Sequence, residues 1–188
     1  MLNKLIGFKW WLFLAGSLFA AGLVLGLVTP VGTSGSLTED IAAIEKMAEF
    51  LRPLPASSLF LFIFAKNVFA ILISFILSPV FCLVPVLALT LNGWLLGWIA
   101  PRVIAEQSVG YLLAGLLPHG IIELPALIIG EAVALSFGAS VMLAIVKRDR
   151  TRRPLASLMP HLKYLALSLA LLLPAALIEA YITPLFLK

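Results

Sequence analysis

The chain carries little charge for its length. Of its 188 residues, only 12% are Asp, Glu, Lys or Arg, whereas soluble domains average about 25%. There is one cysteine, Cys82, which excludes an intramolecular disulfide and leaves that cysteine without a partner for a structural zinc site. The only sizeable hydrophilic segment outside the apolar runs is 31–57, so no separate soluble catalytic domain fits in this chain.

Apolar residues take the place of the missing charge. They make up 62% of the sequence, and the mean hydropathy is +1.13, which indicates an integral membrane protein. We expect residues 1–188 to form a single transmembrane domain whose first partner is the lipid bilayer. The net charge of +4 comes from basic residues in the loops beside apolar runs, so it favours membrane topology over nucleic-acid binding.

The lengths of the apolar runs predict an all-α, polytopic transmembrane bundle. A spanning helix needs about 20 apolar residues. We expect about five spans: an uncleaved first span over 10–29, two spans over 57–100 divided near Ser78, one within 109–146, and a last one over 164–187.

The run from Val109 to Val146 is too long for one ordinary span at about 1.5 Å per residue. It contains Leu117-Pro118-His119-Gly120, which predicts a break. We therefore expect a re-entrant half-helix, Val109 to Leu117, that enters the membrane and turns back before a long helix. The alternative is one continuous, kinked helix.

Two hydrophilic segments predict the topology. Segment 31–57 contains a capping box at Ser36 to Glu39 and apolar residues at helical spacing as far as Leu51, so we expect an extracytoplasmic amphipathic helix there. Segment 147–163 has six basic residues against Asp149, which predicts a cytoplasmic loop. We expect a multi-pass protein of the cell membrane with a cytoplasmic N-terminus and an extracytoplasmic C-terminus.

Polar residues within the spans are the candidate functional residues, because charge in hydrocarbon is costly and normally serves a partner or a site. His119 and Glu123 are four residues apart and share one helix face. They either form a binding site or form a local pair in which His119 caps the break and lowers the burial cost of Glu123.

The segments Leu116 to Glu123 and Leu172 to Glu179 share the pattern Leu-Leu-Pro-x-x-apolar-Ile-Glu. They lie on spans of opposite direction, as in inverted repeats whose sites meet at one depth, although the apolar composition also allows a chance match. Counting residues along the spans predicts one polar centre, made of Lys66, Asn67, Asn92, His119, Glu123 and Glu179. Glu131 is nearly on the face of Glu123, so we expect it deeper in the same cavity or at a contact between chains.

Small residues mark faces where helices approach closely. Asn92-Gly93 with Gly97 four residues later is typical of close helix packing, and we favour packing over ligand contact for this segment. From such faces, and from the small size of one bundle, we expect a homodimer.

Three ordered motifs resemble those of the stage II sporulation protein M family. Segment 118–126 resembles the family's His-Gly-x-x-Glu segment, Asn92-Gly93 with Gly97 resembles its Asn-Gly element, and segment 176–184 resembles its C-terminal signature containing a glutamate. The resemblance implies a multispanning helical protein. The named member works with peptidoglycan-degrading partners in forespore engulfment, but the family also occurs in prokaryotes that never sporulate, archaea included.

The function we predict is a non-enzymatic membrane scaffold or complex subunit, with possible partners among other membrane or cell-envelope proteins. The alternative is an ion or small-solute channel or transporter that uses His119, Glu123 and Glu179. A minor alternative is an intramembrane metal-dependent hydrolase with those three residues as ligands, although the chain lacks His-Glu-x-x-His. We assign no catalytic residue and no cofactor other than a possible bound cation.

Overall fold

The structure, a computed structural model, describes residues 7–29, 54–146 and 158–186. Throughout these ranges the regular structure is helical, and five helices are long and apolar enough to cross a membrane. This confirms the predicted all-α bundle and its span count. The predicted amphipathic helix in 31–57 and most of the basic loop 147–163 lie outside the described residues.

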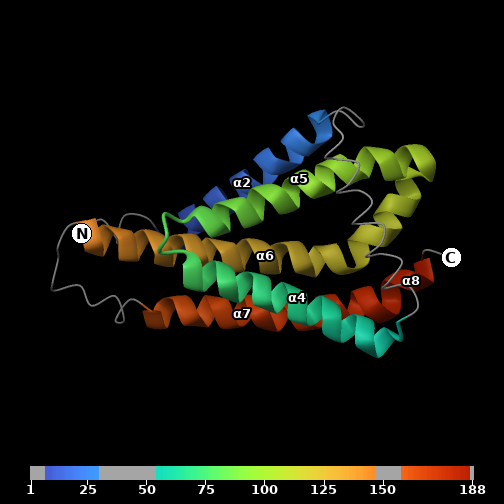
Figure 1. Cartoon of the computed structure of the whole chain (residues 1–188). Helices are drawn as coiled ribbons and strands as arrows, with labels where there is room; N and C mark the ends of the chain where they lie inside the picture. The colour runs from blue at the N-terminus through green and yellow to red at the C-terminus, as the bar shows by residue number, and fades with distance from the viewer. Residues whose placement is uncertain (1–6, 30–53, 147–157, 187–188) are drawn as a thin grey trace.

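The five spans alternate in direction along the bundle (Figure 1). They are α2 (Phe8–Val28), α4 (Ala56–Leu77), α5 (Leu83–Glu106), α6 (Val109–Val146), and a last span that consists of α7 (Leu158–Leu177), a π-helical turn η2 (Ile178–Ile182) and α8 (Thr183–Phe186). The division of the second apolar run near Ser78 is confirmed, since α4 ends at Leu77 and α5 begins at Leu83.

Helices α2 and α5 pack with their backbones in contact. A Cβ added to Gly22 or Gly26 would collide with the backbone carbonyl of Thr90 or Trp94, and one added to Gly93 or Gly97 would collide with backbone of α2. Successive glycines of α2 meet successive turns of α5, so the two helices are parallel. In lipid, where water does not drive helices together, such close packing is a main source of helix association.

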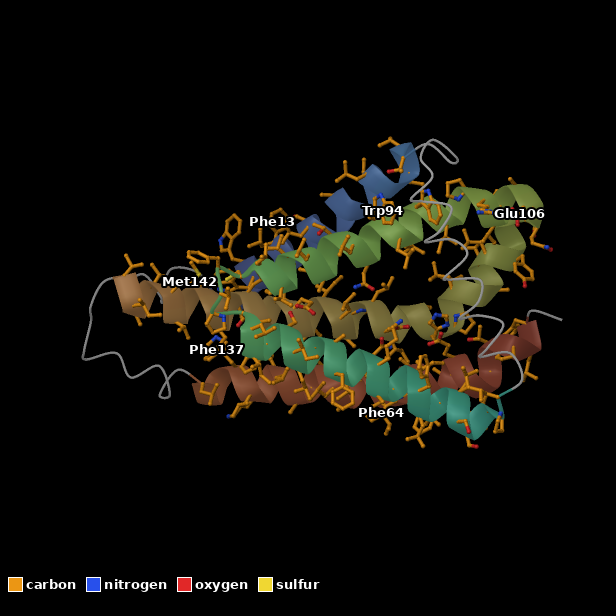
Figure 2. The ribbon with its side chains drawn as sticks, viewed as in Figure 1. Phe13, Phe64, Trp94, Glu106, Phe137 and Met142 are labelled. Carbon is orange, nitrogen blue, oxygen red and sulfur yellow. The ribbon has the colours of Figure 1, made fainter. Side chains whose placement is uncertain are left out.

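A tryptophan fastens the end of this pair. Trp94, labelled on α5 in Figure 2, donates its indole N–H to Thr29 Oγ1 at the end of α2, over 3.0 Å. Both glycine pairs are therefore used inside one chain. Because Gly93 and Gly97 were among the small residues that suggested a homodimer, the homodimer stays a prediction without that support.

The turn between α4 and α5 is docked against α6. Phe81 and Cys82 both have positive φ, near 54° and 53°, a strained conformation for residues with a Cβ. Gly138 of α6 leaves the room the turn needs, because a Cβ there would collide with the carbonyl of Ser78. The Cys82 thiol donates to the Leu135 carbonyl over 3.6 Å, and burial raises its pKa, so it remains a thiol at neutral pH.

Helix α6 is the centre of the bundle. It contacts α2, α4, α5 and α7, and its segment from Gly130 to Leu135 is buried. On one side Val133 and Ala134 pack with Ile71, Phe75 and Leu172. On the other side Ala132 and Leu135 pack with Ala15 and Leu89. Two residues of the predicted polar centre, His119 and Glu123, thus lie on this central helix.

The break expected at Leu117 to Gly120 is absent, and the re-entrant half-helix is not confirmed. Helix α6 runs unbroken from Val109 to Val146 with Pro118 and Pro125 inside it, and Figure 1 shows its first part at a marked angle to the rest. Each proline removes only one backbone hydrogen bond, which bends a helix without ending it. The two prolines are seven residues, about two turns, apart, so their bends fall on the same side and add.

Most of the surface of the spans faces outward. Between 22% and 39% of each span's most apolar stretch is buried within the chain. Phe13, labelled in Figure 2, is 66% exposed on α2. An apolar surface of this extent suits lipid or further membrane partners rather than water.

We predict that Gly22→Ala separates α2 from α5. The added methyl group must push the two backbones apart, and such overpacking costs about 1–3 kcal/mol. The melting temperature of the protein in detergent should fall, followed through the fluorescence of the tryptophans.

The matched control is Gly16→Ala in the same helix, where a Cβ meets nothing within 4 Å. It should leave the melting temperature unchanged. Equal melting temperatures for the two variants would contradict the close contact of α2 with α5.

Candidate functional site

The site begins on α6, just after the bend. His119 and Glu123 are one helical turn apart, and both are partly buried, with 14% and 28% of their side chains exposed. His119 Nε2 and Glu123 Oε2 are 3.8 Å apart, which is longer than a hydrogen bond. The two groups face each other across a gap.

The last span supplies the second carboxylate. Glu179 lies in the π-helical turn η2, a rare widening of a helix that is frequent at functional sites. One ligand atom from each of His119, Glu123 and Glu179 lies within 4.8 Å of the other two. The structure thus brings together the two glutamates that end the repeated Leu-Leu-Pro pattern.

Helix α4 joins the site through Asn67. Its amide Nδ2 donates to Glu123 Oε1 over 2.8 Å, between residues 56 positions apart in the chain. This bond satisfies one carboxylate oxygen, and the second faces His119.

The structure adds one residue, Thr183, that the sequence did not point to. His119 Nδ1 lies 3.3 Å from Thr183 Oγ1, and Thr183 Oγ1 in turn donates to the Ile178 carbonyl. The available signal was its spacing: Thr183 follows Glu179 by four residues and shares its face. A threonine in an apolar helix, however, most often bonds its own backbone.

Lys66 stands at the edge of this group. Its side chain is exposed, yet it interacts electrostatically with Glu179, as does Glu123. Among the described residues the group therefore has two carboxylates and one nearby, largely exposed ammonium group.

Asn92 lies elsewhere, on the exposed surface of α5. Its amide donates to the Ala88 carbonyl of its own helix over 2.7 Å. Counting residues had placed Asn92 at a suitable depth, but depth alone does not fix which side of a helix a residue occupies.

Glu131 forms a second buried polar contact on α6, apart from this group. It is fully buried, and Ser74 Oγ of α4 donates to its Oε2. Its Oε1 has no hydrogen-bond partner among the described residues. Nearby, Ser168 of α7 donates to the Ala126 carbonyl of α6 over 2.7 Å, so polar bonds tie α6 to α4 and α7 along its length.

From here on, polar centre means the group that the structure brings together, which omits Lys66 and Asn92 of the predicted set and adds Thr183: Asn67, His119, Glu123, Glu179 and Thr183. It offers one imidazole and two carboxylates, and these are the residues that could hold a metal ion. In such a setting the group can bind a cation or hold three spans together.

Comparison with known proteins identifies a family and two relatives that the chain resembles. The model of the family described as Stage II sporulation protein M matches residues 11–184. Among similar proteins, an uncharacterized protein of Methanocaldococcus jannaschii is 26% identical over 170 residues, which cover 89% of this chain and 90% of that protein.

A second uncharacterized protein of the same organism is 32% identical over 110 residues, or 57% of this chain. The match spans 50% of that relative's length. No solved structure matches the chain.

We predict that Asn67→Ala destabilises the protein and that Asn92→Ala does not. The first variant leaves a partly buried Glu123 oxygen without its donor, which costs about 1–3 kcal/mol. The second removes only a bond from an exposed side chain to its own helix, and such changes usually stay within about 0.5 kcal/mol.

Thermal unfolding of both variants in the same detergent is the measurement. If Asn92→Ala lowers the melting temperature as much as Asn67→Ala, the polar centre is not where the structure places it.

Proposed function

The chain belongs to the stage II sporulation protein M family, and we propose that it works as a non-enzymatic scaffold or complex subunit in a membrane. In this proposal the polar centre holds α4, α6 and the last span in a fixed arrangement. The outward faces of the spans then meet lipid or partner proteins.

One observation carries this proposal. The 2.8 Å hydrogen bond from Asn67 to Glu123 joins α4 to α6, and the contact of His119 with Thr183 joins α6 to the last span. Hydrogen bonds between spans contribute to holding membrane bundles together. A set that links three helices acts on the arrangement of the whole bundle.

A second candidate function, a conduit for ions or small solutes, has its own support. Polar groups continue along α6 beyond the polar centre, first at Glu131 with Ser74 and then at Ser136, whose hydroxyl lies 3.1 Å from His161 Nε2. Polar residues spaced along a bundle interior are typical of ion and proton pathways. A scaffold, by contrast, does not require water along these residues.

Glu123→Gln separates the two functions. For a scaffold, we expect a lower melting temperature and a weaker yield of cross-linked complex from native membranes, because the amide cannot accept as strongly from Asn67. Liposomes that contain the unmodified protein should leak K⁺, Na⁺ and protons no faster than empty liposomes.

The control is Glu106→Gln at the exposed end of α5 (labelled in Figure 2), where Glu106 pairs with Arg102 of the same helix. It should match the unmodified protein in every assay. A cation flux that Glu123→Gln or Glu131→Gln abolishes without loss of stability would replace the scaffold with the conduit.

We also propose that the N-terminus is cytoplasmic and the C-terminus extracytoplasmic, as the basic segment 147–163 indicates. With Cys82→Ser as background, a cysteine at Glu106 should react with a membrane-impermeant maleimide in intact cells. A cysteine at Phe81, which is 81% exposed at the opposite end, should react only after lysis. The reverse labelling pattern would show that the topology is the opposite of the one proposed.

A further inference from the structure

The contacts around His119 favour one of its two neutral tautomers. Thr183 Oγ1 lies 3.3 Å from the Ile178 carbonyl, to which it can donate. Toward His119 Nδ1, also 3.3 Å away, the same oxygen can then accept, and this arrangement favours the hydrogen on Nδ1. A neutral imidazole has one donor and one acceptor nitrogen, so Nε2 presents its lone pair.

That lone pair faces another acceptor. Glu123 Oε2 lies 3.8 Å from Nε2, while Glu123 Oε1 already accepts from Asn67. Two acceptors that face each other repel unless a positive charge lies between them. One carboxyl oxygen of Glu179 lies within 4.8 Å of a ligand atom of each of these two residues and adds a further acceptor.

The charges of the group also lack a full counterpart. Glu123 and Glu179 are partly buried carboxylates, and Lys66, the basic residue that acts on Glu179, is exposed. Within a membrane, an uncompensated carboxylate is costly, and such residues normally pair with a cation. A bound cation would supply the missing positive charge.

We propose that His119 Nε2, Glu123 Oε2 and a carboxylate oxygen of Glu179 bind one divalent transition-metal ion. The proposal rests on the proposed function, because the ion would hold α6 to the last span as the polar centre does. An imidazole with two carboxylates suits Zn²⁺ or Mn²⁺. Water completes the coordination.

The spacing fits such an ion after a small movement. Zinc bonds to His and Glu are about 2.0–2.2 Å long, so two ligands of one ion stand at most about 4.4 Å apart. The ligand atoms are now within 4.8 Å of one another, and rotation of the glutamate side chains would bring them to the shorter separation.

Thr183 and Asn67 act as positioning residues in this site. A histidine that binds a metal almost always donates its other ring N–H to a fixed acceptor, and its carboxylate neighbours are themselves hydrogen-bonded. Thr183 and Asn67 occupy those two places.

The test uses the full chain, purified in detergent with its affinity tag removed and its metals stripped by a chelator. Equilibrium dialysis against Zn²⁺ and, separately, Mn²⁺ should give one bound ion per chain, counted by mass spectrometry. Cobalt substitution should give a visible spectrum with the histidine as ligand.

Two pairs of variants make the result specific. His119→Ala and Glu179→Gln should abolish the stoichiometric site, whereas His161→Ala and Glu106→Gln should retain it with unchanged affinity. Thr183→Val, which keeps the shape but removes the acceptor for Nδ1–H, should weaken binding about 10–100-fold.

Equal binding by all variants, or no stoichiometric binding by the unmodified protein, would overturn the metal site. The second result together with a stability loss in Glu123→Gln would leave the scaffold standing, with the polar centre held by its hydrogen bonds and without a metal ion. A cation flux through liposomes would instead remove the scaffold while the bound ion could still be counted, so the two proposals fail separately.

Discussion

Hydrocarbon offers no hydrogen bonds, so a polar group within the spans of this protein is stabilised when it finds a partner on a neighbouring helix. The arrangement of the polar side chains follows from that constraint. Asn67 reaches Glu123, Ser74 reaches Glu131 and Ser168 reaches a carbonyl of α6, and each of these bonds crosses from one helix to another. Helix α6 takes part in all three, which explains how one span with two prolines remains well packed.

The helices on the two sides of α6 are held together in different ways. Between α2 and α5 the glycines bring backbone against backbone, so association there depends on van der Waals contact. Between α4, α6 and the last span, hydrogen bonds between polar side chains add to the packing of an apolar core. The α2–α5 pair packs against one side of α6. The polar residues on the other side of α6 face α4 and the last span.

The sequence could predict the spans because a run of about 20 apolar residues has few other structural meanings. It could also identify His119, Glu123, Glu179 and Asn67 as candidate functional residues, since polar residues in such runs are rare. It could not predict on which side of its helix each of these residues lies. Asn92 has the right depth but occupies the outer face of α5, and residue counting measures only rise along the helix.

The helix at Pro118 differs from the expected half-helix for another reason, which bears on how the polar centre forms. A proline in an apolar run predicts a boundary, but within a membrane bundle neighbouring helices support the weakened turn, and α6 continues as the bent helix of the alternative prediction. His119 follows the first proline directly, and Glu123 precedes the second, Pro125, by two residues. The bend therefore sets the direction of this face, while the π-helical turn in the last span carries Glu179. The bend in α6 and the π-helical turn in the last span thus both lie beside the polar centre. These two departures from regular helix position its side chains.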